Sequence, residues 1–172
     1  MRSGVRPFLF GFVTALILII VGGYVFIASG GVSMETTARP LPLEGAIARL
    51  ALHASYGHAA DQRSPLPPGE ATLLAGARVY RDSCAMCHST PGQPHTAIAK
   101  GMFPDPPALF DPHEMVTDDP EGIIYWTITH GIRLSGMPGF GATLSDTERW
   151  QVTQLVAHAD KLSPAAQAVL KP

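Results

Sequence analysis

The residues best suited to chemistry lie in one short stretch, SCAMCHS at positions 83–89. This stretch contains both cysteines of the 172-residue chain, Cys84 and Cys87, and His88 follows them directly. Two neighbouring thiols can form a disulfide, bind a metal ion, exchange disulfides or carry a covalently attached group. Each of these roles requires different surroundings, so the rest of the sequence decides between them.

The surroundings of the two cysteines favour one of these roles. A structural zinc site takes four ligands, and the sequence offers no second Cys-x-x-Cys or closely spaced histidine pair to complete them. A redox pair of the thioredoxin type belongs to an alternating strand and helix pattern, whereas this sequence predicts helices separated by loops rich in proline and glycine. Cys-x-x-Cys-His is the attachment signature of c-type haem. We therefore expect one haem c bonded to Cys84 and Cys87, with His88 as an iron ligand.

The residue that fills the sixth position of the iron decides between electron transfer and ligand chemistry. We expect Met137, because it lies in SGMPGFG, where glycines allow the backbone close to a flat ring and Pro138 stiffens the turn. His130 is the main alternative, although it ends a predicted helix, where an imidazole also acts as a cap. Met102 and Met115 are expected to be ordinary packing residues. Ligation by His88 and a methionine suits outer-sphere transfer of single electrons.

The elements that must position these residues are predicted to be helices, which makes the chain all-α. Helical spacing of apolar residues, a helix-opening proline and a capping box formed by Ser145 and Glu148 indicate them, and strand signals are weak. Residues 95–120 contain too many prolines for a regular helix and must form a shaped loop. The expected helices cover residues 71–83, 120–131 and 148–162, with a shorter one at 45–55.

The N-terminal segment is predicted to be a membrane helix. Residues 7–28 are almost entirely apolar, which matches the ~20 residues that a bilayer core requires and exceeds the roughly 7–15 of a signal peptide. We therefore expect a retained anchor, with cleavage after Ala28-Ser29-Gly30 as the alternative. Arg2 and Arg6 precede the span, which favours a cytoplasmic N-terminus and places the bulk of the chain outside the cytoplasm.

Composition and charge suggest three parts: an anchor at 1–30, a tether at 31–69 rich in Pro, Gly and Ser that includes the short helix, and a haem domain at 70–172. The chain has a net charge of -2, and the part beyond the anchor is more acidic because two arginines precede the span. This charge argues against nucleic acid as a partner.

Residues 70–163 resemble the small monohaem class I cytochromes c, especially those related to the cytochrome c subunits of bacterial haem-copper oxidases. The resemblance covers over half of the chain, and its motifs occur in the order of the family. These motifs are GARVYRDSCAMCH at 76–88, PAL at 107–109, GIRLSGMP at 131–138 and ERW at 148–150.

The resemblance implies an all-helical fold in which the helix at 71–83 crosses the helix at 148–162. It also implies that the carbonyl of Pro107 accepts the second imidazole N–H of His88, and that Leu109 packs on the haem face.

Candidates to contact the haem propionates are Arg133, Trp126 and Trp150. Both tryptophans are equally well explained as core residues. The sequence departs from the family at Ser89, where glycine is frequent, and at Gly139, where alanine is common. Both departures are expected to change loop rigidity and solvent access.

We therefore expect a membrane-anchored monohaem cytochrome c that passes single electrons on the periplasmic side of a bacterial inner membrane. Its partners would be the membrane and other redox proteins, either as fellow subunits of a respiratory or other redox complex or as docking partners of a tethered carrier. It would be an electron carrier and not itself an enzyme. The alternatives are a haem enzyme, such as a peroxidase, or a gas sensor, both of which require an open sixth position.

Overall fold

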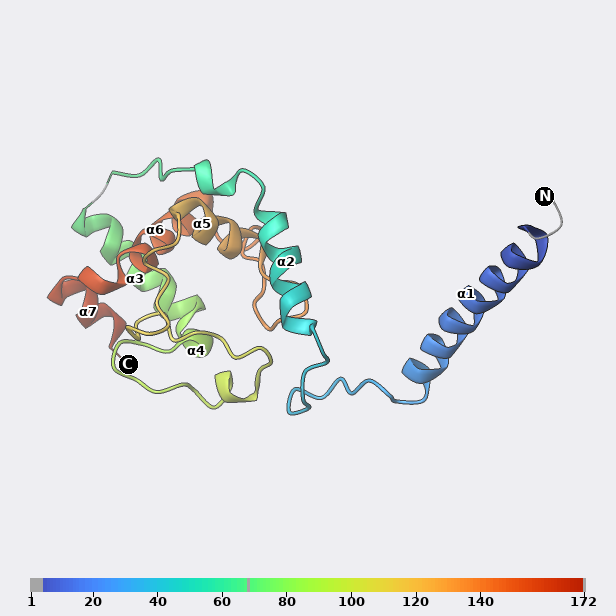
Figure 1. Cartoon of the computed structure of the whole chain (residues 1–172). Helices are drawn as coiled ribbons and strands as arrows, with labels where there is room; N and C mark the ends of the chain where they lie inside the picture. The colour runs from blue at the N-terminus through green and yellow to red at the C-terminus, as the bar shows by residue number, and fades with distance from the viewer. Residues whose placement is uncertain (1–4, 68, 172) are drawn as a thin grey trace. The chain divides into compact units, whose positions relative to one another are not determined.

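The computed structural model describes residues 5–67 and 69–171 and divides into two compact units, Met1–Pro42 and Leu43–Pro172 (Figure 1). Within the described residues all regular structure is helical and no strand occurs. The all-α prediction is therefore confirmed. The three functional parts expected from the sequence, 1–30, 31–69 and 70–172, stay a prediction.

The first unit contains the helix α1 (Val5–Ala28). Its 24 residues give a length of about 36 Å at ~1.5 Å per residue, against a hydrocarbon core of about 30 Å. Beyond Arg6 it has no charged side chain, and all of its side chains are exposed. By length and composition α1 could cross a membrane, and a signal sequence near the N-terminus would have the same properties. Arg2, used above to orient the span, lies outside the described residues.

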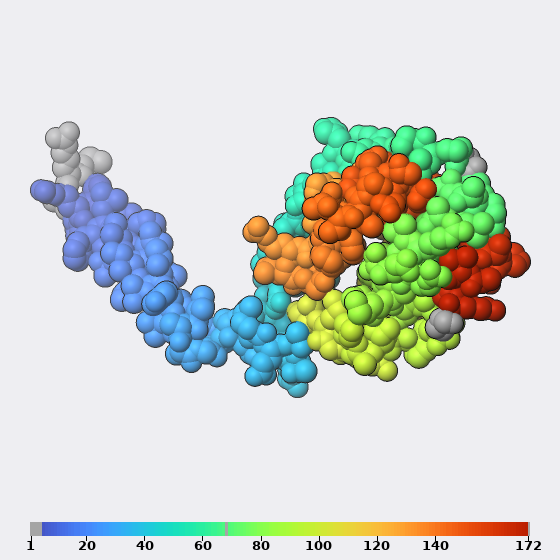
Figure 2. Space-filling view, turned by 180° about the vertical axis from the view of Figure 1, so that it is seen from behind, coloured from blue at the N-terminus to red at the C-terminus, as the bar shows by residue number. Residues whose placement is uncertain are grey.

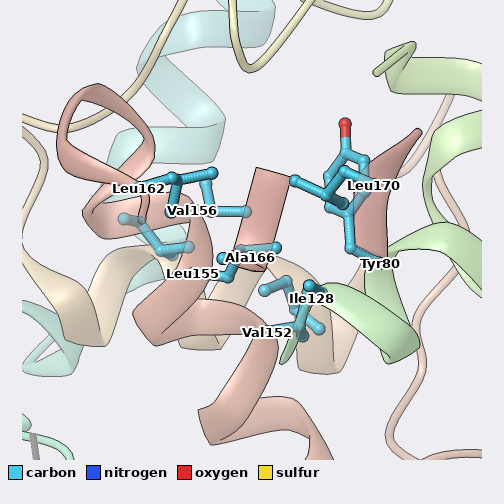
Figure 3. Packing of buried hydrophobic residues seen from close by; sticks show 10 residues of the cluster. Tyr80, Ile128, Val152, Leu155, Val156, Leu162, Ala166 and Leu170 are labelled. Atoms are coloured by element: carbon cyan, nitrogen blue, oxygen red, sulfur yellow. The ribbon is translucent and has the colours of Figure 1, made fainter. Parts of the chain in front are cut away.

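The second unit is built around four helices, α3 (Glu70–Ser83), α5 (Glu121–His130), α6 (Asp146–Ala157) and α7 (Pro164–Leu170). α6 is the most buried of them. α3 and α5 pack directly against α6, and α7 packs against α3 (Figure 1). Figure 3 shows the resulting core from close by. The buried cluster consists of Ala77, Tyr80, Ile124, Ile128, Val152, Leu155, Val156, Leu162, Ala166 and Leu170.

Local sequence signals set the ends of these helices. α5 starts after Pro120 and ends at Gly131, whose φ of +68° favours glycine. α6 starts at the predicted capping box: the Glu148 amide donates to Ser145 Oγ at 3.2 Å, and the Ser145 amide donates to the Glu148 carboxylate at 2.8 Å. α6 ends five residues earlier than the sequence suggested, and a short 3₁₀ turn, η3 (Ala159–Lys161), follows it.

The helix α2 (Glu44–Tyr56) and the 3₁₀ turn η1 (Ala59–Asp61) belong to the second unit. The Tyr56 ring meets the Trp126 ring of α5 edge to face, with centroids 5.2 Å apart. The carbonyl of the first η1 residue approaches α5 so closely that a Cβ at Gly122 would lie 1.8 Å from it. The segment after α2 is therefore packed against α5.

The capping box predicts a pH-dependent stability. The Ser145 hydroxyl, and then its amide, hydrogen-bond to the Glu148 carboxylate and lower the pKa of Glu148. A carboxyl whose pKa is lower in the folded state stabilises it above the ordinary pKa of ~4.3, and this contribution is lost as the pH falls through the lowered value. In urea unfolding we expect Glu148→Ala to be less stable than the parent at pH 7, with a difference that shrinks toward pH 3. Glu148→Gln, which keeps a side-chain acceptor, should lose less, and an equal difference at both pH values would contradict the prediction.

Candidate haem site

The two cysteines lie at the junction of α3 with the short helix α4 (Ala85–His88). Both are free thiols and half-buried, and Cys84 packs against the core cluster. Burial, with a smaller contribution from Cys87, raises the pKa of Cys84 to about 12. Cys84 is therefore a protonated thiol at neutral pH, which does not suit disulfide exchange because the thiolate is the nucleophile in that reaction.

The imidazole of His88 is held in one tautomer. Its Nδ1 lies 2.8 Å from the carbonyl oxygen of Pro107. A carbonyl only accepts hydrogen bonds, so Nδ1 carries the proton and the lone pair of Nε2 is left for a metal. Burial lowers the pKa of His88, partly offset by the hydrogen bond to Pro107. The ring is thus kept neutral, which is the form that binds metals.

The turn that carries His88 is held in place by the hydroxyl of Tyr80. This buried phenol donates to the carbonyl of Ser89 at 2.8 Å, and the carbonyl of His88 lies 3.2 Å away. Burial, assisted by Cys84, raises the pKa of Tyr80, so the phenol keeps the proton that it donates. The helix that precedes the Cys-x-x-Cys-His motif therefore also anchors the residues that follow it.

Ser89 has φ +62° and ψ -178°, a backbone conformation that is nearly restricted to glycine and costs about 1–3 kcal/mol for other residues. Its side chain is buried and donates to the carbonyl of Pro94 at 3.2 Å. This geometry explains why glycine is frequent at this position in the cytochromes that the sequence resembles. The serine hydrogen bond offsets about 1 kcal/mol of the strain.

The loop that carries Met137 is tied to the end of α5 by backbone hydrogen bonds. The amide of Ile132 donates to the carbonyl of Met137 at 3.2 Å, and the amide of Phe140 donates to the carbonyl of Ile128 at 2.9 Å. The Ser135 hydroxyl also lies 3.2 Å from the Met137 amide. Met137 is therefore positioned by main-chain contacts on both sides of it.

Two glycines permit this close pairing. A Cβ at Gly131 would lie 2.5 Å from the amide nitrogen of Gly139, and a Cβ at Gly139 would lie 2.7 Å from the carbonyl carbon of His130. The expected effect of Gly139 on loop rigidity thus has a steric basis. On the same loop, a Cβ at Gly136 would lie 1.9 Å from the terminal methyl of Met102, so Met102 packs against the residue before Met137.

These groups lie at the rim of one core. Cys84, Leu109 and Met137 are far apart in the sequence, yet all three are partly buried against the same apolar cluster. Figure 2 shows that the surface is hollowed between α3 and the segment after α5. A neutral imidazole and a thioether can bind the iron of a c-type haem, and two thiols can attach its ring covalently, so the residues present fit that group.

A cavity of about 330 Å³ does not coincide with this set. It borders Pro107 but includes none of the cysteines or methionines, and it mixes acidic and basic side chains. A porphyrin needs apolar walls around its ring, so the candidate site is defined by the donor groups and not by this cavity. The cavity is lined by His95, Ala99, Lys100, Asp105, Pro106, Pro107 and Glu114.

Comparison with known proteins identifies the family. Residues 71–156, half of the chain, match the family model of cytochrome c oxidase, cbb3-type, subunit III. The chain belongs to this family. The matched range includes the Cys-x-x-Cys-His motif and Met137. The protein is therefore a c-type cytochrome, as the sequence indicated, and membership in this family implies haem and electron transfer.

Among solved structures, a chain of the Kuenenia stuttgartiensis reducing HAO-like protein complex is similar to this cytochrome, with 26% identity and a TM-score of 0.48. The likeness covers 62% of the present chain, which spans 56% of that chain. No curated protein sequence matches the present chain.

The residues considered for the propionates of the cytochrome fall into different environments. Trp150 is buried and stacks on the Tyr125 ring with centroids 4.1 Å apart. Trp126 contacts Tyr56 and the ring of His130, whereas Arg133 is exposed. Trp150 thus lies in the core.

Sequence reasoning did not find the role of Arg149. Its guanidinium donates to the carbonyls of Gly141 at 3.0 Å and Leu144 at 2.8 Å, and to the Tyr125 hydroxyl at 3.2 Å. It therefore joins the end of the Met137 loop to α5 and α6. The only signal in the sequence was an arginine directly after the capping-box glutamate, which places it at the start of α6 beside the incoming loop.

Proposed function

We propose that this cytochrome is a membrane-anchored monohaem carrier of single electrons on the periplasmic side of a bacterial inner membrane. The observation that carries the proposal is the hydrogen bond of His88 Nδ1 to Pro107, which leaves Nε2 free beside two unpaired thiols. In the proposal Cys84 and Cys87 hold one haem c covalently, and His88 and Met137 bind its iron.

The haem would supply an iron that changes charge by one electron. The protein supplies geometry: the Pro107 carbonyl fixes the ring plane and tautomer of His88. Main-chain hydrogen bonds hold the Met137 loop in place whichever charge the site has. Leu109 at the rim of the core would cover one face and exclude water, which favours a high potential. Little has to move when the charge changes, as rapid electron transfer requires.

The membrane and the partners are part of the same proposal. α1 has the length and composition of a span, and Arg2 and Arg6, which precede its apolar stretch, favour export of the second unit. The matching family is named as a subunit of a cbb3-type oxidase. We infer that the partners are other subunits of a membrane redox complex, or redox proteins that dock on a tethered carrier. The acidic exported part gives no support for nucleic-acid binding.

The test is purification of the native protein from membranes in a mild detergent. We expect the haem domain to stay with the membrane fraction, to contain one haem per chain, and to keep its colour in acid-acetone, since thioether-bonded haem is not extractable. Redox subunits should be purified with it if it is a permanent subunit. As a control, a double Cys84→Ser and Cys87→Ser protein should retain no acid-stable colour.

Two results would contradict the proposal. Haem that acid-acetone extracts would show that Cys84 and Cys87 do not hold it covalently. Rapid binding of carbon monoxide to the reduced protein at neutral pH would indicate an open sixth position, and would favour a haem enzyme or gas sensor instead.

A further inference from the structure

One peptide group, between Pro107 and Ala108, is hydrogen-bonded at both ends. Its carbonyl oxygen accepts the Nδ1 proton of His88 at 2.8 Å. Its N–H, the amide of the buried Ala108, donates to Oε2 of Glu114 at 2.6 Å. His88 and Glu114 are therefore linked through a single planar and polarisable unit.

The two hydrogen bonds of this peptide reinforce one another. A carboxylate that accepts from the N–H draws the proton toward itself and moves electron density onto the carbonyl oxygen, because the amide is conjugated. Hydrogen bonds to an ionised acceptor are also shorter and about twice as strong as those between neutral groups, as the 2.6 Å separation indicates. The oxygen that holds His88 is thus more basic than in a peptide without a charged partner.

A more basic acceptor at Nδ1–H makes the imidazole a stronger electron donor at Nε2. A ligand with more negative character favours the oxidised, more positively charged form of a metal at that nitrogen. The direction of the effect is therefore a lower midpoint potential.

The Glu114 side chain lies between the peptide of Pro107 and a polar cavity. The carboxylate lines the 330 Å³ cavity and is 41% exposed, so water can solvate it. Nε2 of His95 lies 3.5 Å from the same oxygen that accepts from Ala108. The other charged side chains lining the cavity are Lys100 and Asp105, and no hydrogen bond joins either of them to the peptide of Pro107 within the described residues.

We propose that Glu114 is a positioning residue that acts on the iron ligand His88 through the Pro107–Ala108 peptide, and thereby lowers the midpoint potential of this cytochrome. The inference rests on the proposed ligation by His88. Neither the Cys-x-x-Cys-His motif nor the PAL motif includes Glu114, which reaches the site only through the fold of the loop at 95–120.

The test compares Glu114→Gln with Asp105→Asn in the full-length, haem-loaded protein. Glu114→Gln keeps an acceptor for Ala108 but removes the charge, whereas Asp105→Asn removes the same charge from the same cavity without touching the peptide. Two quantities are measured: the midpoint potential, and the proton resonance of His88 Nδ1–H in the reduced state.

For Glu114→Gln we expect the reduction equilibrium to shift about threefold toward the reduced form, which is about 28 mV at ~59 mV per tenfold for one electron. The His88 Nδ1–H resonance should move upfield and exchange faster with solvent, because its acceptor is weaker. Asp105→Asn should give less than half of that potential shift and leave the resonance in place.

Three outcomes would overturn the inference. The first is an unchanged potential or resonance in Glu114→Gln. The second is an equal shift of the potential in Asp105→Asn, which would show that any negative charge in the cavity acts through space and that the peptide is not needed. The third is loss of the six-coordinate spectrum in Glu114→Gln, which would make the residue purely structural. If the unaltered protein itself lacks that spectrum, the proposed function fails, and this is seen before any variant is compared.

Discussion

Replacement of Met137, the proposed sixth ligand, by alanine should lower the midpoint potential by on the order of 0.2 V, a fraction of the about 0.8 V over which axial ligands set haem potentials. The thioether favours the reduced iron, and nothing else on the loop supplies an equivalent donor at that position. The fold should survive, because the loop is held by main-chain bonds that do not involve the Met137 side chain. Potentiometric titration, with electron paramagnetic resonance to read the spin state, checks both statements.

Met102→Ala is the matched control for this experiment. Met102 is also a partly buried methionine, and its methyl packs against Gly136 on the same loop. Its removal should leave the spin state unchanged and shift the potential only slightly. If Met102→Ala had the large effect and Met137→Ala the small one, the assignment of the sixth ligand would be wrong.

Replacement of Gly76 by alanine should cost about 3 kcal/mol or more of the free energy of unfolding, at the upper end of the range for overpacked sites. α3 and α6 cross so closely that a Cβ at Gly76 would lie 2.2 Å from the carbonyl oxygen of Gln151 and 3.1 Å from Cβ of Leu155. The first obstacle is backbone, so no side-chain rotation relieves it and the two helices must separate. Since about 1 kcal/mol shifts the Tm of such a domain by roughly 4–8 °C, the Tm should fall by more than about 10 °C.

Gly101→Ala tests whether this loss is specific to the crossing. A Cβ at Gly101 meets nothing within 4 Å, so this substitution should change the free energy of unfolding by less than about 0.5 kcal/mol. Thermal unfolding of the two variants under the same redox conditions gives the comparison. A Gly76→Ala protein as stable as Gly101→Ala would show that the crossing can widen without cost.

The parts of the fold that depend on local sequence were predictable. The Ser145 and Glu148 pair, Pro120 and Gly131 mark helix ends by interactions within one turn, and the structure has all of these ends. The helix α7, which is not among the predicted helices, also carries a local signal, a Ser163 cap whose hydroxyl accepts from the Ala166 amide at 3.1 Å. That signal is short and was not recognised.

The contacts between distant segments could not be predicted in the same way. The Cys-x-x-Cys-His motif points to its chemistry because the attachment needs a fixed spacing, and the bond between His88 and Pro107 was expected only from the family resemblance. Nothing in the spacing of residues pairs Glu114 with Ala108, or Tyr56 with Trp126, since both contacts exist only after the chain has folded.

The packing of Tyr56, at the end of α2, and of η1 against α5 limits how far the second unit can move from α1. With residues 43–64 held in the second unit, only 29–42 connect it to the end of α1. An extended chain spans at most about 3.5 Å per residue, so this linker can span at most roughly 50 Å. If residues 43–64 were not held in the second unit, the flexible connection to α1 would be longer by that segment. In the proposed anchored protein, residue 43 therefore stays within that distance of the end of α1, and we expect the redox partner to be embedded in or bound to the same membrane.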